Sequence, residues 1–351
     1  MATAPSGSPS GELLVPAGPP AAARPARALI PQFGGIWGFI FRRVLLGLLV
    51  LFIVSIVVFA ATQALGDPAR AILGRQATPY SLKALRDQLN LDRSVTSQYW
   101  SWLTGLLHGD AGVSFAAQQP VSTLIDERIV NSAFLVFCAG IISIPLAIAV
   151  GAYAALRRDK GFDSATSLIT LLFAAMPEFV IGLWLVVIFA TTVFPGTLPS
   201  ITQIAPGGRP WDDMKAMILP TTTLVLAVTP YVARIVRASM IEVLESDYVE
   251  MARLKGLSER TVMIRHALPN ALGPTFQVIA INLAYLAGGV IVVEYIFNYA
   301  GIGGALRDGV NNHDIPVVQA LAMLIAAIYV VLNLLADIAT ILVTPRLRTR
   351  L

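Results

Sequence analysis

One charged, amphipathic stretch, residues 247–269 (DYVEMARLKGLSERTVMIRHALP), lies between two long apolar runs and offers a partner both apolar and charged side chains. Its residues recur at the spacing of a helix face: Tyr248, Met251, Ala252 and Lys255, with Glu250 and Arg253 on the other side. Gly256 ends this helix, because glycine adopts the left-handed conformation at little cost. Ser258 is the expected N-cap of a second helix, which Pro269 closes. The stretch predicts a helix, a glycine elbow and another helix.

The physical pattern alone leaves two interpretations of this stretch open: an amphipathic hairpin on the lipid surface, or a docking segment for another protein. The motif resembles the EAA loop of ABC-importer permeases, E-A-A-x3-G-x9-I-x-L-P. Met251 replaces one alanine and His266 the isoleucine, and the Arg-His-Ala-Leu version is typical of the peptide-importer branch. The resemblance implies a coupling helix that docks in a groove of the ATP-hydrolysing subunit. It assigns this role to Asp247, Tyr248, Glu250, Met251, Ala252, Lys255, Gly256, Leu257, His266 and Pro269.

An acidic residue stands near the middle of the third apolar run, where Glu178 directly follows Pro177. A charge at the bilayer centre costs about 2.5–3.5 kcal/mol on insertion scales, so this carboxylate must face the bundle interior, a partner or water. Glu178 either makes an inter-helix hydrogen bond or lines a translocation path, where it could meet the cationic amino end of a peptide. Pro177 frees a backbone carbonyl about one turn back and offers a kink. A proline is usual here in the family that the loop resembles, whereas the glutamate is not.

Four further polar side chains inside or at the ends of the apolar runs are candidates for a role: two amides and two carboxylates. Asn282 and Asn333 are expected to bond across helices, and they are candidates for the translocation path. Glu294 precedes a glycine-rich turn near the external end of the fifth run, in a pattern similar to the family's Val-Val-Glu. We expect a structural or docking role for it at an external gate rather than substrate contact. Asp337 is expected to pair with a basic residue or the facing subunit.

The composition is that of a polytopic membrane protein, since 56% of the 351 residues are apolar, 13% are charged and the mean hydropathy is +0.72. The single cysteine, Cys138, indicates neither a disulfide framework nor a cysteine metal site. The three histidines are too scattered to suggest a metal-ligand cluster. The net charge of +4 does not indicate nucleic-acid binding, because the basic residues lie at the ends of apolar runs.

The sequence gives little support to an enzyme, and no residue is assigned a catalytic role. No GxSxG, HExxH, Walker GxxxxGK[ST] or GxGxxG motif stands in a suitable context. An intramembrane aspartyl protease would need two mid-membrane aspartates, and only Asp337 offers itself. If ATP drives transport, another chain must hydrolyse it. We therefore expect ATP and Mg²⁺ in partner subunits and no cofactor or metal on this chain.

The apolar runs predict an all-α fold with six transmembrane helices, each run being at least about 19 residues long. They cover about residues 39–65, 132–156, 164–194, 217–235, 272–297 and 315–343. The tail at 1–35, rich in Pro, Ala, Gly and Ser, is expected to be disordered and not to be a signal peptide. The remaining units are a first transmembrane helix at 36–65, an extracytoplasmic loop at 66–130, a permease core with helices 2–6 at 131–345, which includes a cytoplasmic coupling loop at 239–270, and a cytoplasmic tail at 346–351.

Residues 66–130 carry their own signals. Thr78 and Pro79 predict the N-cap and first residue of a short helix. Interfacial anchoring is expected of the aromatic residues Tyr99, Trp100, Trp102 and Phe115. The region also resembles the first external loop of dipeptide and oligopeptide permeases through Leu91-Asp92-Arg93, Gln98-Tyr99, Gly109-Asp110 and Ser114-Phe115.

The distribution of basic residues predicts the topology. Lys and Arg gather in the N-terminal flank, after the second and fourth runs, and at the C-terminus, whereas the alternate short loops hold few. The positive-inside rule therefore places both termini and the 247–269 stretch in the cytoplasm. The resemblance to importer permeases implies that the membrane is the bacterial cytoplasmic (inner) membrane.

The chain resembles, over about residues 39–350, the permease subunits of the dipeptide/oligopeptide ABC importer family. The resemblance implies import by alternating access, and four kinds of partner: a second, homologous permease, two ABC ATPase subunits, an extracytoplasmic peptide-binding protein and membrane lipid. Three alternatives stay open: an ABC permease for nickel or another small solute, an ATP-independent transporter or channel, and a membrane scaffold or receptor component whose loop docks a signalling partner.

Overall fold

The computed structural model describes residues 35–74, 77–89, 91–191, 193–194, 196–205 and 207–343. Within these ranges the regular structure is helical, without a named strand. The predicted tails, 1–35 apart from Gly35 and 346–351, lie outside the described residues. In chain order the helices are α1 (Gly35–Gln63), α2 (Pro68–Leu73), α3 (Pro79–Gln88), α4 (Val95–Leu107), α5 (Val121–Leu156), α6 (Gly161–Ala175), α7 (Glu178–Val186), η2 (Val187–Thr191), α8 (Met214–Leu244), α9 (Asp247–Leu254), α10 (Glu259–Thr261), η3 (Val262–Ala267), α11 (Leu268–Ile296), α12 (Ile302–Asn311) and α13 (Ile315–Val343).

Four described helices are long and apolar enough to cross a membrane: α1 over Gly38–Gln63, α5, α8, and α13 over Ile315–Ala339. Two further candidates are bent. The helix α6 meets α7 at 104°, and α11 turns by 48° between Thr275–Leu283 and Gly288–Ile296. The chain is therefore a polytopic all-helical protein, and it has up to six spans if each bent pair is one span.

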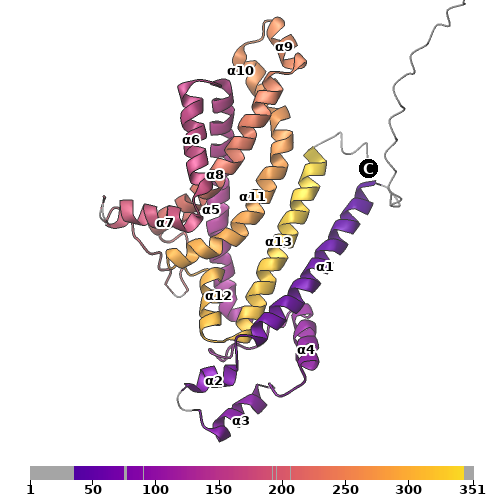
Figure 1. Ribbon diagram of the computed structural model, residues 1–351, viewed down its shortest axis with the longest axis vertical. Coiled ribbons are helices and arrows are strands. Elements are labelled where there is room, and N and C mark those ends of the chain that lie inside the picture. Colours follow the sequence, from indigo (N-terminus) through magenta and orange to yellow (C-terminus); the bar gives the residue numbers. More distant parts are fainter. Residues whose placement is uncertain are drawn as a thin grey trace, which may run out of the picture.

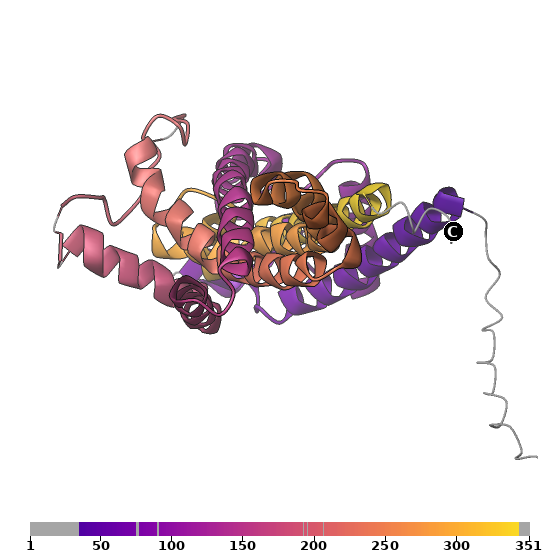
Figure 2. The same cartoon turned by 90° about the horizontal axis from the view of Figure 1, so that it is seen from above.

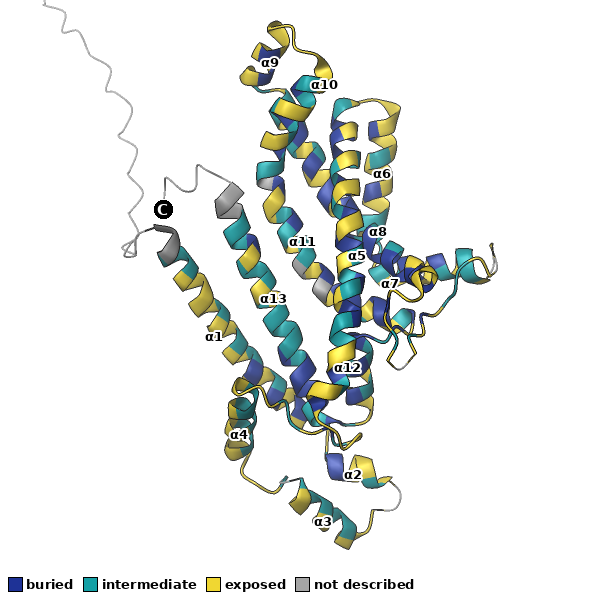
Figure 3. Ribbon diagram, turned by 180° about the vertical axis from the view of Figure 1, so that it is seen from behind, coloured by how far each residue is buried: buried dark blue, intermediate teal, exposed yellow. Residues whose placement is uncertain are grey.

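The helix α8 forms the centre of the bundle, with 78% of its most apolar window buried against 11% for α1. The helices α5, α6, α7 and α11 pack around it (Figures 1 and 3). Gly151 of α5 lies so close to α8 that a Cβ there would meet the Ala233 carbonyl and the Val236 side chain. The small residue allows the two long helices to approach backbone to backbone.

The helix α1 joins the rest of the chain mainly through α13. Arg43 Nε lies 3.1 Å from Asp337 Oδ2, so Asp337 has the basic partner that was predicted. Gln319 Nε2 of α13 donates to Thr62 Oγ1 at 2.8 Å. Figures 1 and 2 show α1 and α7 extending from the bundle on opposite sides. Most apolar side chains of α1 are exposed, which suits a helix that faces lipid or another membrane subunit.

The described residues between 66 and 120 form a layer at the end of the bundle opposite to α9 and α10 (Figure 1), and we call it the α2–α4 layer. Thr78 caps α3 in a capping box with Ser81, and a proline occupies the first turn, as predicted. Asp314, just before α13, fixes the far end of this layer. Its carboxylate accepts from Ser114 Oγ at 2.5 Å and from the Phe115 backbone N–H at 3.0 Å.

The aromatic residues of α4 lie differently from the sequence-based expectation. Tyr99 and Trp102 pack on Phe59 of α1, with ring centroids 5.3 and 5.9 Å away. The Tyr99 hydroxyl also shares a hydrogen bond of 2.9 Å with Ser55 Oγ. Trp100 is more than half exposed. Tyr99 and Trp102 therefore attach α4 to α1, and of these three rings only Trp100 is free for interfacial anchoring.

The third apolar run is not one straight helix. The helix α6 ends at Ala175, Met176 has an extended backbone (φ −91°, ψ 130°), and α7 begins at Glu178 after Pro177. Proline lacks the N–H that would continue the helix and disfavours the helical conformation of the residue before it. The predicted kink is thus a complete break, and Glu178 opens the second helix instead of lying in the middle of a straight one.

Candidate functional site

Residues 247–269 begin with the predicted helix and glycine elbow, at the end of the bundle shown at the top of Figure 1. The helix α9 ends at Leu254, and Gly256 then has a φ of +79°. Nothing lies within 4 Å of a Cβ built on Gly256, so the left-handed backbone, and not lack of space, favours glycine. Ser258 caps α10 by accepting the N–H of Thr261, as predicted.

The two faces of α9 differ from the predicted ones. Val249 and Ala252 are buried, and they form a small cluster with Val262 of η3. Tyr248 and Met251, which the predicted pattern put on one face with Ala252, are 46% and 56% exposed. Val249, which the predicted pattern omitted, is therefore the residue that attaches α9, and the Tyr248 and Met251 side chains are available to a partner.

Charged side chains surround this exposed apolar pair. Arg253 pairs with Glu259 across the elbow at 2.9 Å. Glu250 and Lys255 are exposed, and neither contacts a group of opposite charge among the described residues. Leu257 adds a further exposed apolar group next to the elbow. Apolar groups with charges of both signs around them form a surface suited to a protein partner.

The second helix of the stretch does not end at Pro269, contrary to the sequence-based prediction. The helix α10 continues into the π-helical turn η3 and then into α11, where Pro269 occupies the first turn. Proline is tolerated in the first turn of an α-helix, although it has no N–H to donate. The His266 carbonyl accepts from Asn270 Nδ2 at 2.7 Å. The stretch is thus joined to α11 without a turn.

Two ion pairs connect the helices next to this stretch. Buried Asp163, in the first turn of α6, accepts from Arg237 of α8 at 2.5 and 2.7 Å and from the Asp159 backbone N–H at 3.0 Å. Arg158 pairs with Glu245 at the end of α8. The sequence analysis missed the Asp163–Arg237 pair. An aspartate two residues after Gly161 was a visible helix-start signal, but nothing in the sequence indicated a partner 74 positions away.

Polar groups of α6, α7, α8 and α11 meet near the break after α6. The Tyr231 hydroxyl donates to the Ala174 carbonyl at 2.9 Å, one of the last carbonyls of α6. The Tyr285 hydroxyl donates to Glu178 Oε2 at 3.1 Å. A cavity of about 720 Å³ is lined by α6, α8 and α11 residues that include Thr170, Tyr231, Arg234, Arg237 and Asn282. Glu178 thus makes an inter-helix hydrogen bond, and two tyrosines that the sequence did not single out complete the polar cluster.

Among the described residues the two amides bond within their own helices and not across helices, which corrects the prediction. Asn282 Nδ2 donates to the Val278 carbonyl of its own helix at 2.8 Å, and Asn333 Nδ2 donates to the Tyr329 carbonyl at 2.8 Å. A short polar side chain in an apolar helix can reach the carbonyl one turn back, so no neighbour is required. Asn282 lines the cavity between α6, α8 and α11, whereas Asn333 is on α13 and is not among its lining residues.

Glu294, in the last turn of α11, is completely buried, and its carboxylate lies at the start of α12. Its carboxylate accepts from Ser132 Oγ and from the Gly303 backbone N–H, the latter at 2.7 Å. A Cβ on Gly301 would collide with this carboxylate, so the glycine-rich turn provides the space that it occupies. An acidic group at a helix N-terminus is favourable. The burial supports the structural alternative for Glu294.

Tyr299 completes this turn. Its hydroxyl donates to the Asn131 carbonyl at 2.6 Å, and the Asn131 amide in turn donates to the Ala300 carbonyl at 2.8 Å. Burial raises the pKa of the Tyr299 hydroxyl far above its ordinary value, so it stays protonated and acts as a donor. The turn between α11 and α12 is therefore fixed to α5.

Comparison with known proteins shows the family. The family model called binding-protein-dependent transport system inner membrane component matches residues 147–349. The family model for the N-terminal part of such membrane components matches residues 36–135. The chain belongs to this permease family. A probable peptide ABC transporter permease of Sinorhizobium fredii is 35% identical over 311 residues, which are 88% of this chain and 99% of the relative. The glutathione transport system permease GsiC of Escherichia coli K12 is 35% identical over 306 residues, with coverage of 87% and 97%.

A peptide transport system permease of Brucella abortus is 36% identical over 310 residues, with coverage of 88% and 98%. A solved amino acid ABC transporter with histidines has a TM-score of 0.44 and 18% identity, covering 64% of this chain and 94% of that one. The chain is accordingly an inner-membrane permease subunit of an ABC importer, a transport subunit and not an enzyme. Permeases of this family work with ATPase and substrate-binding partners. Among the described residues, no group of three or more His, Cys, Asp or Glu side chains could hold a metal ion.

Proposed function

We propose that this chain is the permease subunit through which an ABC importer moves di- and oligopeptides by alternating access. One observation carries the proposal: the exposed Tyr248 and Met251 lie on a helical elbow whose arms lead into α8 and α11. These two helices line the polar cavity and carry the tyrosines of the Glu178 cluster. A partner that moves the elbow therefore acts directly on the helices around the cavity. The names of the curated relatives, which include peptide and glutathione permeases, favour a peptide substrate.

The partner at the elbow is an ATPase subunit. ATP and Mg²⁺ bind to two such subunits, and their closure displaces the coupling residues Asp247, Tyr248, Glu250, Met251, Ala252, Lys255, Gly256, Leu257, His266 and Pro269 as one body. A second, homologous permease completes the path across the membrane, and an extracytoplasmic binding protein delivers the peptide. ATP is the ligand that distinguishes the two states of the permease pair, as a population shift requires.

The α9 end of the bundle faces the cytoplasm in this proposal, and the chain crosses the membrane six times. The α9 end carries Arg157, Arg158, Lys160, Arg253, Lys255, Arg260 and Arg265. Both chain ends belong to this side, because α1 begins and α13 ends there (Figure 1). The positive-inside rule supports this orientation. Each bent pair, α6 with α7 and the two parts of α11, then counts as one broken span.

The translocation path follows the face where α6, α7, α8 and α11 meet. Glu178 is half buried there with one Tyr285 bond, so its carboxylate keeps acceptor capacity for the amino end of a peptide. Pro177 places this carboxylate at the start of α7, and Asn282 lines the adjoining cavity. Broken helices in a membrane occur where they line a cavity or are buried in protein. Asn333 stays a predicted contributor from α13.

The decisive experiment replaces the elbow glycine. The transporter is purified with its co-purifying subunits and reconstituted in proteoliposomes, and peptide uptake is measured together with ATP hydrolysis. Gly256→Asp should leave the protein inserted in the membrane and abolish peptide uptake, because a Cβ and a charge distort the left-handed turn. Gly207→Asp is the matched control, since Gly207 has a φ of +75° and equally open surroundings. It lies in the loop before α8, which faces away from the cytoplasm in the proposed topology. Normal uptake by Gly256→Asp would overturn the coupling role.

A further inference from the structure

A pocket of about 600 Å³ lies between the α2–α4 layer and the adjoining ends of α1 and α13. It is at the opposite end of the bundle from the elbow (Figure 1), and none of the coupling or cavity residues lines it. Its wall combines the rings of Phe59, Trp102 and Phe115 with amides and charged groups. The volume is within the range of small-molecule sites, and the lining is about equally polar and apolar, which suits a charged ligand more than an apolar one.

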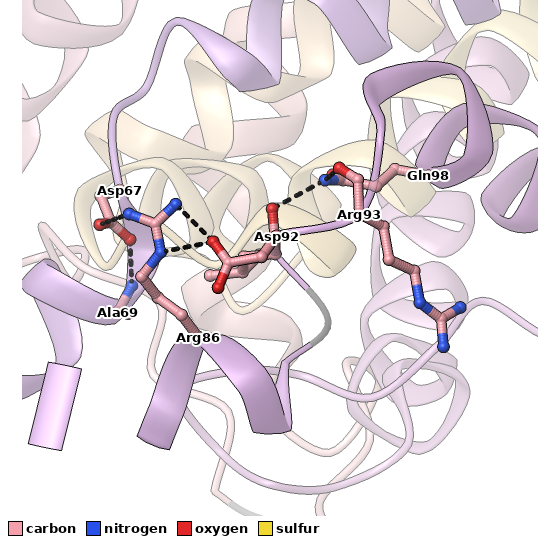
Figure 4. A network of polar contacts seen from close by, with 7 residues as sticks. Asp67, Ala69, Arg86, Asp92, Arg93 and Gln98 are labelled. Carbon is pink, nitrogen blue, oxygen red and sulfur yellow. Dashed lines mark hydrogen bonds and ion pairs between the residues drawn. The ribbon is translucent and has the colours of Figure 1, made fainter. Parts of the chain in front are cut away.

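Most charged groups around this pocket already neutralise one another. Arg86 bonds Asp67 at 3.0 Å and Asp92 at 2.9 Å (Figure 4). The other Asp67 oxygen accepts the Ala69 N–H at 3.0 Å. The Gln98 amide donates to backbone carbonyls, including that of Arg93 at 2.9 Å. These contacts build the wall and leave the carboxylates of Asp67 and Asp92 paired with a cation.

Two charged groups at the pocket are not neutralised. The guanidinium of Arg93 points away from the Asp67–Arg86–Asp92 network in Figure 4, and it makes no contact with an acceptor among the described residues. Asp110 accepts the Gly112 N–H at 2.8 Å, and no cationic side chain of the described residues pairs with it. The Trp102 indole N–H, in the same wall, is buried without an acceptor. Among the described residues that line it, the pocket thus has one cation without an acidic partner, Arg93, and one carboxylate without a cation, Asp110.

We propose that this pocket binds a small zwitterion, an amino acid or short peptide with both termini free. Arg93 faces the ligand's carboxylate and Asp110 its ammonium group, through charge-assisted hydrogen bonds. This proposal rests on the proposed function in one respect: the ligand belongs to the same class of molecule as the solute that the importer is proposed to move. It gives the permease a site of its own for the peptide, separate from the binding protein.

Binding can be measured without transport. The full chain, with the membrane subunits that co-purify but without soluble binding protein, is placed in nanodiscs and titrated with alanyl-alanine by calorimetry. Alanyl-alanine amide, which lacks the carboxylate, and N-acetyl-alanyl-alanine, which lacks the ammonium group, are titrated in parallel. Arg93→Gln and Asp110→Asn should each weaken alanyl-alanine binding at least tenfold. Lys83→Gln is the matched control, because Lys83 is an exposed basic residue of the same layer that does not line the pocket.

The expected pattern is saturable binding of alanyl-alanine, weak binding of both blocked peptides, and an unchanged dissociation constant in Lys83→Gln. Arg93→Lys, which keeps the charge, should bind better than Arg93→Gln, and this difference separates a lost contact from a misfolded layer. The proposal is overturned by absence of binding, by equal binding of the blocked peptides, or by equal losses in Arg93→Gln and Lys83→Gln. None of these results depends on coupling, so loss of uptake in Gly256→Asp with intact alanyl-alanine binding would leave both proposals standing.

Discussion

The carboxylate of Asp163 and the guanidinium of Arg237 form a two-point ion pair, with Nε–Oδ1 and Nη2–Oδ2 distances of 2.5 and 2.7 Å. The pair holds the start of α6 against α8 between the elbow and the break at Pro177. Arg237 also lines the cavity next to Asn282. One buried interaction therefore connects the neighbourhood of the proposed coupling elbow with the helices that surround the cavity.

Arg237→Ala should destabilise the protein, because it leaves Asp163 charged and nearly inaccessible to water. Breaking one partner of a buried pair costs about 3–5 kcal/mol. Thermal unfolding of the purified variant in detergent measures the loss. Arg253→Ala is the control, since the Arg253–Glu259 pair is largely exposed and such pairs contribute about 0–1 kcal/mol. Equal unfolding temperatures for the two variants would contradict the role assigned to Asp163.

Gly151→Ala should weaken the packing of α5 on α8. The added methyl would meet the Ala233 carbonyl and lie 2.8 Å from Val236 Cβ, and overpacking of this kind costs about 1–3 kcal/mol. Gly273→Ala, in a helix with nothing within 4 Å of the new Cβ, should be neutral or stabilising by about 0.5–1 kcal/mol. Thermal unfolding of both variants tests the difference, and a stabilised Gly151→Ala would show that the two helices can separate freely.

Glu178→Gln should raise the KM for uptake of peptides with a free amino terminus about tenfold, a loss of about 1.4 kcal/mol of binding. The charge is removed, whereas the acceptor for the Tyr285 hydroxyl is kept. Uptake of N-acetylated peptides serves as the internal control and should not change. An equal rise in KM for both kinds of peptide would assign Glu178 a structural role.

Substitutions on α9 should separate docking from folding. Tyr248→Ala and Met251→Ala should lower transport and stimulated ATP hydrolysis at unchanged unfolding temperature, because both side chains are about half exposed. Val249→Ala removes a completely buried side chain and should destabilise the segment by about 0.5–2 kcal/mol. Assays of ATP hydrolysis and hydrogen exchange on the same samples compare the two effects. Full coupling in the Tyr248→Ala/Met251→Ala double variant would remove this face from the ATPase contact.

The sequence predicted the helices that local signals determine. Thr78 with Pro79, Gly256 and Ser258 each act within a few residues of their own position, and all are used as expected. The sixth run also coincides with α13. The second run does not, because α5 begins at Val121 and includes polar residues 126–128 that interrupt the apolar pattern without ending the helix.

Contacts between residues far apart in the chain could not be predicted from local sequence signals. Both Tyr231 and Tyr285 look like ordinary apolar-run residues until the break at Pro177 brings a free carbonyl and a carboxylate near them. The burial of Val249 depends on η3, whose course depends on Pro269 lying inside a continuous helix and not at its end. The sequence around a proline does not by itself show whether the proline ends one helix or lies in the first turn of the next.

The continuity of α10, η3 and α11 has a mechanical consequence. A turn at Pro269 would have allowed the elbow to move independently of α11. With helix on both sides of that proline, we expect a displacement of the elbow to be transmitted along α11 to its 48° bend, between Leu283 and Gly288. This bend in α11 lies within the bundle, in the same helix as Tyr285, whose hydroxyl bonds to Glu178.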